Sequence, residues 1–408
     1  MTAGSAGGGR AWFGILLVMA TLLQAATAVA RPMASYRALE IGMDPGSLGF
    51  VAAAFAVAPV VFALSIGRRI DQWGPFVFLV GSSLVMVVAS LGLAYAGSAA
   101  ALLGLIGVLG LGQLVFVVAD QTLVGSRTPT GAYDSRFGSL SFVASLGQLI
   151  GPAAAGVVAA DGTPEGTSRA LVLGAVLSLA AIPLALVLWR RDPGPARAVP
   201  AVRPPAPSVL SILRMPGMGP AMLASMTVLA TMDVMTVYLP ALGEERGLAV
   251  ATVGALLAVR AGASMASRLF LGRLVAFFGR DRLLIGSLAV AAGAVAALPF
   301  LPLPLAFVAM AIAGTTLGLG QPMTMSWVAA RATESARGTA MSLRLLGNRV
   351  GQVLIPLAAG SVAVVTGTSG VLAAAGATVA VSAVVVAARR PPSGPALPPE
   401  AEDPGSSV

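Results

Sequence analysis

Twelve apolar runs recur along the sequence, and each, at about 20 residues, is long enough to cross a lipid bilayer as one α-helix. In the core of a bilayer every backbone amide must find its partner inside the protein, so such runs are expected to be helical. The sequence therefore predicts an all-α integral membrane protein with twelve transmembrane helices. We place these spans near residues 11–36, 46–66, 75–95, 99–124, 137–160, 169–190, 215–240, 249–271, 282–300, 303–328, 338–362 and 367–388.

The composition supports this class and excludes several functions. The 408 residues are 57% hydrophobic and 10% charged, whereas a soluble domain carries about 25% charged residues. Cys and His are absent, and all 25 basic residues are Arg. Without Lys, Cys and His the chain cannot build a Walker P-loop, a Schiff base, a thiolate metal site or the common nucleophile–base pairs. We expect no enzyme, no ATP-driven pump, no cofactor and no bound metal.

Short glycine motifs occur twice and indicate an internal duplication. The tetrapeptide Gly-Leu-Gly-Gln stands at 110–113 and again at 318–321. Two further sets keep their internal spacings: Gly67 and Gly74 match Gly272 and Gly279, and Gly138, Gly147 and Gly151 match Gly338, Gly347 and Gly351. All are offset by roughly 200 residues, about half the chain. The offset predicts two homologous six-helix bundles, and in duplicated membrane proteins of this kind a binding site commonly lies at the seam.

The halves are expected to be separated by a linker. We place the first bundle at 1–190 and the second at 214–390. The segment 191–213 is rich in proline, which predicts an extended cytoplasmic linker. The segment 391–408 is rich in Pro, Glu, Ser and Gly and is expected to be a disordered tail.

The arginines between the spans predict the orientation in the membrane. With the N-terminus in the cytoplasm, seventeen of them lie inside. Arginines flanking spans concentrate on the cytoplasmic side, so we expect a multi-pass protein of the cell inner membrane with both termini in the cytoplasm. The net charge of +9 is distributed between the spans and not along one soluble face, so nucleic acid is not an expected partner. Four arginines fall outside in this arrangement: Arg31, Arg37, Arg169 and Arg246.

Polar side chains inside the spans are candidate site residues, because charges and amides are costly in a bilayer. Arg260 and Arg349 lie about eleven residues from a span end, close to the midplane. Arg268 and Arg344 lie nearer the cytoplasmic ends, where their side chains could snorkel to the headgroups. The candidate substrate contacts are Gln24, Gln113, Gln148, Arg260, Gln321 and Arg349, and the candidate proton-coupling groups are Asp233 and Asp120.

Two interpretations of the deep charges remain open. Asp233 could pair with Arg260 or Arg349 and simply hold two helices together. Alternatively, the surplus positive charge binds an anionic group of a substrate, to which Arg makes bidentate contacts, while Asp233 carries a proton. The glutamines suit hydrogen bonding to a substrate and helix–helix contacts equally well.

The loop after the second span resembles a known family signature. Residues 67–74 read Gly-Arg-Arg-Ile-Asp-Gln-Trp-Gly, which is similar to the Gly-x-x-x-Asp-x-x-Gly loop of the major facilitator superfamily. The resemblance implies the twelve-span fold of that family, a monomer, and a cytoplasmic latch formed by Gly67, Asp71 and Gly74. The second copy has Ala276 where the aspartate would stand.

The fifth span resembles the antiporter motif of the drug/proton exchangers in that superfamily. It carries Gly147, then Gly151-Pro152, and Ala155 where the motif has a glycine. The resemblance implies that Gly147, Gly151 and Pro152 help to seal one side of a cavity. Ile106 occupies the place where the fourth span of proton-coupled exporters usually has an arginine.

The leading hypothesis is thus a secondary active transporter that exports a small anionic or amphipathic compound in exchange for protons by alternating access. The first alternative is an importer or facilitator of a small organic anion, centred on Arg260 and Arg349. An alternative of another class is a non-transporting membrane scaffold or sensor, which buried charges in both halves disfavour.

Overall fold

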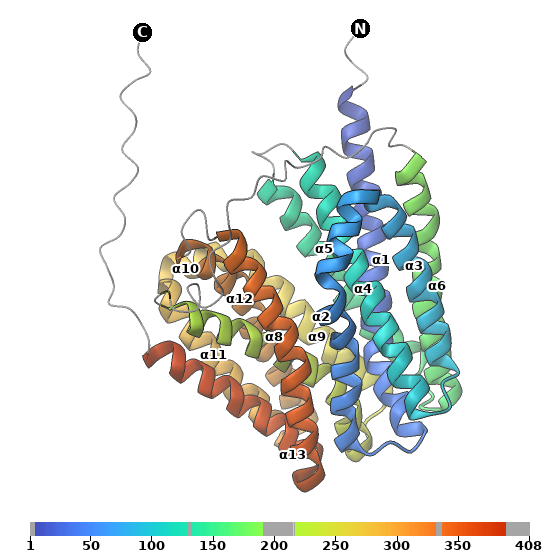
Figure 1. The fold of residues 1–408 in the computed structure, drawn as a ribbon. Coiled ribbons are helices and arrows are strands. Elements are labelled where there is room, and N and C mark those ends of the chain that lie inside the picture. Colours follow the sequence, from blue (N-terminus) through green and yellow to red (C-terminus); the bar gives the residue numbers. More distant parts are fainter. Residues whose placement is uncertain (1–4, 129–132, 191–214, 216, 332–336, 389–408) are drawn as a thin grey trace, which may run out of the picture.

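The structure is a computed structural model that describes residues 5–128, 133–190, 215, 217–331 and 337–388. The linker expected at 191–213 and the tail expected at 391–408 lie outside the described residues. Helices joined by short loops make up the described chain (Figure 1). The first half contains α1 (Ser5–Glu40), α2 (Leu48–Trp73), α3 (Pro75–Ala94), α4 (Ala99–Arg127), α5 (Tyr133–Val158) and α6 (Pro164–Arg190).

The second half repeats this plan, with one long helix that counts as two spans. α13 has 52 residues and is interrupted at Gly367, whose φ of 67° and ψ of −173° are not helical. Within the described residues, 11 helices are long and apolar enough to cross a bilayer, and the division of α13 makes them twelve spans. The predicted all-α fold of two six-helix bundles is confirmed. The elements of this half are α8 (Met218–Glu245), α9 (Val250–Leu269), α10 (Leu271–Phe278), α11 (Arg280–Ala297), α12 (Leu303–Arg331) and α13 (Arg337–Ala388).

Matching glycine turns join α2 to α3 and α10 to α11. Gly74 has φ 79° and ψ 158°, and Gly279 has φ 77° and ψ 148°. Only glycine adopts such a backbone without strain, and each of these glycines also hydrogen-bonds back to the helix before it. Gly74 and Gly279 are therefore structural equivalents, as their spacing from Gly67 and Gly272 predicts.

The halves meet through two equivalent helix pairs, α2 with α13 and α9 with α5. A Cβ atom built on Gly49 would lie 2.3 Å from the carbonyl oxygen of Pro356, and one on Gly254 would lie 2.4 Å from that of Pro152. Gly49 and Gly254 are 205 positions apart, and the two prolines are 204 apart. Small residues let the backbones approach at both places, so the pairs are related by an approximate two-fold axis.

Both helix pairs make these contacts toward the end of the bundle where α1 stops and α2 begins, here called the Glu40 end. The opposite end, where α4 stops, is called the Arg127 end. A Cβ on Gly360 would lie 2.5 Å from the oxygen of Gly46, and one on Gly156 would lie 3.0 Å from Cα of Ala251. In Figure 1 α2 and α13 lie against each other toward this end. The halves are therefore closed against each other at the Glu40 end.

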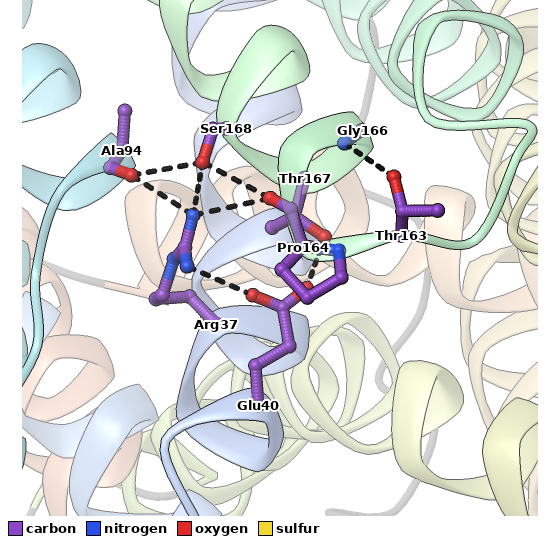
Figure 2. A network of polar contacts seen from close by, with 8 residues as sticks. All are labelled: Arg37, Glu40, Ala94, Thr163, Pro164, Gly166, Thr167 and Ser168. Atoms are coloured by element: carbon purple, nitrogen blue, oxygen red, sulfur yellow. Dashed lines mark hydrogen bonds and ion pairs between the residues drawn. The ribbon is translucent and has the colours of Figure 1, made fainter.

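A polar network holds the first half together at the Glu40 end (Figure 2). Arg37 donates to the carbonyl oxygen of Ala94 at 2.8 Å and to the hydroxyl of Ser168, which joins α1 to α3 and α6. Its other amine lies 3.1 Å from the carboxylate of Glu40, which also accepts from Thr167. The second half repeats part of this arrangement, because Thr368 donates to Glu245. These bonds fix the ends of α1 and α8 relative to their own bundles.

We predict that Gly110→Ala destabilises the protein by about 1–3 kcal/mol, the usual cost of overpacking. A Cβ at Gly110 would lie 2.0 Å from the carbonyl oxygen of Phe55, so α4 could not approach α2 as it does. Thermal unfolding of the purified protein in detergent measures the effect. Gly104→Ala on the same helix is the control, because nothing lies within 4 Å of its Cβ position. Equal midpoints for the two variants would contradict the prediction.

Candidate functional site

A cavity of about 250 Å³ lies between the halves, midway along the helices. The first half contributes lining residues from α1, α2, α4 and α5, and the second half from α8, α9 and α13. Phe55 is the single aromatic residue among the described residues that line it. The wall is unusually polar for a membrane interior, with the following polar residues: Gln24, Thr27, Arg31, Gln113, Gln148, Asp233, Thr236, Arg260, Arg349 and Gln352.

An ion pair crosses the cavity from one half to the other. Nη1 of Arg31, on α1, lies 2.5 Å from Oδ1 of Asp233, on α8. Both side chains are largely buried, and the Arg31 guanidinium lies 4.5 Å from the centroid of the Phe55 ring. A buried pair of this kind is a contact between the halves that depends on the charge of a single carboxylate.

A chain of hydrogen bonds extends this pair to α13. The amide nitrogen of Gln352 donates to Oδ2 of Asp233, and Nη1 of Arg349 donates to Oε1 of Gln352 at 3.0 Å. Asp233 thus has its two oxygens occupied by groups from both halves. A change in the protonation of Asp233 would therefore alter its ion pair with Arg31 and, through Gln352, the hydrogen bond of Arg349.

Arg260 is the least satisfied cation of the site. Arg260 is 8% exposed, and its Nε has no hydrogen-bond partner among the described residues. The described residues that line the cavity include three arginines and one aspartate, which leaves a surplus of two positive charges. Uncompensated charge in a low-dielectric interior is costly, so an anion is the chemical complement of this cavity.

The first-half wall is made of linked amides and hydroxyls. The Gln113 amide donates to Oε1 of Gln24 at 3.0 Å, and its oxygen accepts from Thr27 at 2.8 Å. Gln148, also predicted, lines the cavity from α5 and is exposed to it. These groups can donate to or accept from a solute without adding charge.

Five of the six predicted substrate contacts line this one cavity, together with Asp233: Gln24, Gln113, Gln148, Arg260 and Arg349. The hypothesis that Asp233 pairs with Arg260 or Arg349 is wrong, because its ion-pair partner is Arg31. Arg31 had been placed at the outer end of the first span. In the structure α1 continues past it to Glu40, so it lies well inside the helix.

Gln321 does not belong to this cavity, and the prediction that it lines the site is corrected. The packing shows why. Gly110 packs on the backbone of Phe55, and in the second half Gly314 packs on the backbone of Arg260, its Cβ position 2.2 Å from that oxygen. The structural equivalent of Gly110 is thus Gly314 and not Gly318, so the matching tetrapeptides are out of register by one helical turn.

The same offset between the halves changes the second-half equivalents of Gln148 and Gly147. Pro152 and Pro356 are equivalent, so Gln148 corresponds to Gln352 and Gly147 corresponds to Gly351. The prediction that Gly147 matches Gly347 is therefore wrong by one turn. The sequence signal that could have found Gln352 is its position four residues before a proline, as for Gln148.

Arg344 and Arg268 do not snorkel outward. Arg344 is 4% exposed and donates to the side-chain oxygen of Gln321 at 2.8 Å, and Gln321 in turn donates to the backbone of Ser225 at 2.9 Å. Arg268 donates to the hydroxyl of Ser145, on α5 of the other half, at 2.9 Å. Both arginines point into the protein between helices.

Asp120 also lies apart from the central cavity. It is buried on α4, and its Oδ1 has no hydrogen-bond partner among the described residues. The residues that line the central cavity do not include it. Its role in proton coupling stays a prediction.

The predicted gating residues fall into two places. Gly74 forms the α2–α3 turn, Gly67 lies within the last two turns of α2, and the side chain of Asp71 is outside the described part of the structure. On α5, Cβ atoms at Gly147 and Gly151 would lie 2.8 Å and 2.7 Å from backbone atoms of Ala25, so both glycines let α5 pack on α1. Pro152 contacts α9, as described above.

Comparison with known proteins decides the family. A sequence model described as Major Facilitator Superfamily matches residues 16–249 and 221–408. The chain belongs to the major facilitator superfamily. It is accordingly a multi-pass membrane transporter and not an enzyme. A search of curated protein sequences finds no match.

Solved structures of this superfamily share the fold. The nucleoside transporter NupG has a TM-score of 0.74 at 15% identity, over 93% of this chain and 98% of that one. A bacterial homolog of the human lysosomal transporter Spinster, in an inward-facing and unoccupied conformation, has a TM-score of 0.74 at 14% identity, over 95% and 96%. A D-xylose–proton symporter has a TM-score of 0.74 at 13% identity, over 92% and 96%.

Proposed function

We propose that this superfamily member is a proton-coupled transporter of small organic anions. The observation that carries the proposal is the surplus of two positive charges around a polar cavity between the halves, counted over the described residues that line it. Arg260 and Arg349 are the groups that bind the acidic part of the solute, because the Nε of Arg260 has no hydrogen-bond partner among the described residues and Arg349 donates to the neutral Gln352. Gln24, Gln113 and Gln148 bind its polar remainder.

Asp233 is the proton carrier in this proposal, and linkage predicts the sense of coupling. Protonation of Asp233 removes its negative charge, frees Arg31 from the ion pair and makes the cavity more positive. An anion then binds more tightly, and by reciprocity a bound anion favours the proton. Proton and anion therefore bind together, which is the behaviour of a symporter. The proposal thus favours the import of a small organic anion over its export.

Efflux by antiport is the second candidate, and the α5 motif favours it. Gly147, Gly151 and Pro152 match the element of drug/proton exchangers and pack α5 against α1 and α9. An antiporter requires that proton and cargo exclude each other. A cargo with a cationic group that competes with Arg31 for Asp233 would meet that requirement.

The orientation and the present state are part of the proposal. The excess of arginines at the Arg127 end favours a cytoplasmic location for that end. Arg31 is largely buried within α1 and no longer counts among the outer arginines, so the excess is larger than the sequence alone indicates. The closed helix pairs lie at the Glu40 end, so the conformation described here faces the cytoplasm. Opening of these pairs would expose the cavity to the other side and complete an alternating-access cycle.

The test is transport in proteoliposomes that contain the purified protein. Labelled acetate, benzoate, succinate and glycerol 3-phosphate are offered with and without a pH gradient, each beside a neutral analogue such as the amide or the free alcohol. We expect one or more anions to accumulate when the source side is acid, and the neutral analogues to be ignored. Accumulation of an anion in exchange for protons moving the other way would support antiport. Equal transport of the anions and their neutral analogues would contradict the anion site.

A further inference from the structure

A second cavity, of about 540 Å³, lies between α5 of the first half and α9, α12 and α13 of the second. It shares no lining residue with the central cavity. The Arg268–Ser145 hydrogen bond crosses between the halves at its wall, 2.9 Å long. The two cavities are therefore lined by different residues, and the second lies closer to the Arg127 end.

Two arginines give the second cavity its charge. Arg268 and Arg344 both line it, and among its described lining residues there is no Asp or Glu. Nε of Arg344 is buried and has no hydrogen-bond partner among the described residues. The partners of the two guanidiniums are neutral: Ser145, Gln321, Thr324 and the backbone oxygen of Gly318. Two cations thus face this cavity without a counter-charge.

The approximate symmetry of the fold shows that these cations are not required by the architecture. The position equivalent to Arg268 in the first half is Ala63, and that equivalent to Arg344 is Leu140. Both counterparts are apolar, although the helices around them pack in the same way. The two charges are therefore not part of the repeated architecture, and their presence calls for another explanation.

The rest of the wall is apolar and partly open. Phe142, Leu269 and Met325 line the cavity and are between 43% and 68% exposed. Met265, Leu271 and Pro322 continue the same surface. An occupant would cover these side chains while its acidic group meets Arg268 and Arg344. This combination fits a molecule with one acidic head and an apolar body.

We propose that the second cavity is a binding site for amphipathic monoanions, with the head group held by Arg268 and Arg344 and the apolar body on Phe142, Leu269 and Met325. The head is a carboxylate or a phosphate, and the molecule can come from the aqueous phase or from the bilayer. Binding of the head competes with Ser145 for Arg268, so it loosens one bond between the halves.

The chain contains no Cys, which allows a direct test with a single introduced thiol. Ser141 lines the cavity and is exposed, so the Ser141→Cys variant reports on its interior. The rates of reaction with anionic sulfonatoethyl and cationic trimethylammonioethyl methanethiosulfonate are compared in liposomes of phosphatidylcholine. Ser98→Cys, at an exposed position at the Glu40 end, supplies the reference ratio.

We expect the ratio of anionic to cationic rate to be at least about tenfold higher at Ser141→Cys than at the reference, since a positive cavity concentrates anions. Adding Arg268→Gln or Arg344→Gln should bring the ratio back to the reference, whereas Arg169→Gln at the Glu40 end should not. Octanoate should slow the reaction, and octanol and octylammonium should not. Equal ratios at the two thiols, or equal protection by octanol, would overturn the proposal.

Two further protection experiments show whether the ligand is a lipid or a solute, and whether this cavity binds anions independently of the central cavity. Protection by phosphatidylglycerol in the bilayer, without octanoate, would place the ligand among lipids, and protection by octanoate alone would place it among solutes. In the Arg349→Gln background octanoate should still protect the thiol, because that arginine lines the other cavity. Loss of protection there would show a single anion site and would overturn the second one, while leaving the central site in place.

Discussion

Replacement of Asp233 by Asn is expected to abolish the coupling of anion movement to protons while preserving anion binding. The substitution removes the carboxylate that lines the central cavity among the described residues but keeps an oxygen for Arg31, whose Nη1 lies 2.5 Å from Oδ1 in the wild-type protein. A pH difference of one unit, with one coupled proton, can drive about tenfold accumulation. In proteoliposomes the variant should reach no accumulation above equilibrium, while exchange of labelled for unlabelled anion continues.

The matched control for this experiment is Asp161→Asn. Asp161 also pairs with an arginine, Arg169, but it is exposed at the Glu40 end, far from the cavity. That variant should accumulate the anion as the wild-type protein does. If Asp233→Asn accumulated the anion normally, the ion pair with Arg31 would be a helix contact only, and the proton would have to be carried elsewhere, with Asp120 the next candidate.

Replacement of Arg349 or Arg260 by Gln should weaken anion binding by about 10- to 100-fold. A hydrogen bond to a charged group contributes about 1.5–3 kcal/mol, and about 1.4 kcal/mol corresponds to a factor of ten. Both arginines line the cavity, and Gln is long enough to keep part of the packing. The measurement is the dissociation constant of each anion that the liposome experiment identifies.

A loss of charge selectivity separates a binding role from a structural one. The variants should bind the anion more weakly and the neutral analogue about as well as before. Arg169→Gln, which removes an exposed arginine at the Glu40 end, should change neither. A parallel loss for anion and neutral analogue would mean that Arg349 and Arg260 hold the helices in place and do not recognise charge.

The fold could be predicted from the sequence because the bilayer leaves few choices. Runs of about 20 apolar residues must be helical there, so the twelve spans follow from length alone. The break in α13 was also predictable, because a separate span was expected to begin at residue 367 and the structure interrupts the helix at Gly367. Local patterns decided these features, and no contact between distant residues was needed.

The partner of Asp233 could not be predicted, because helix ends set by hydropathy are uncertain where a charge is buried. The first span is predicted to end at residue 36 with Arg31 on the outer side of the membrane, yet α1 continues to Glu40 and Arg31 lies well inside it. Only the approach of α1 and α8 across the halves shows that Arg31 meets a carboxylate. Pairing between helices that are about 200 residues apart is a property of packing and not of either segment.

The structural equivalence of residues in the two halves also could not be predicted by matching identical tetrapeptides. The tetrapeptides at 110–113 and 318–321 are identical, but the glycine that packs on the equivalent backbone oxygen of the neighbouring helix is Gly110 in one half and Gly314 in the other. A glycine-rich helix offers several equivalent-looking positions, one turn apart. The residues of the neighbouring helix determine which of these positions makes the close contact. As a result, Gln113 lines the central cavity, whereas Gln321 binds Arg344.

Proton uptake on anion binding tests the central claim most directly. The purified protein is held in weakly buffered detergent solution with a pH indicator, and an anion that stays fully ionised at the measuring pH is added. The linked charges of Asp233 and the three arginines predict that the wild-type protein takes up as much as one proton per bound anion, and that Asp233→Asn takes up none. Release of protons by the wild-type protein on anion binding, or binding without any change in pH, would contradict it.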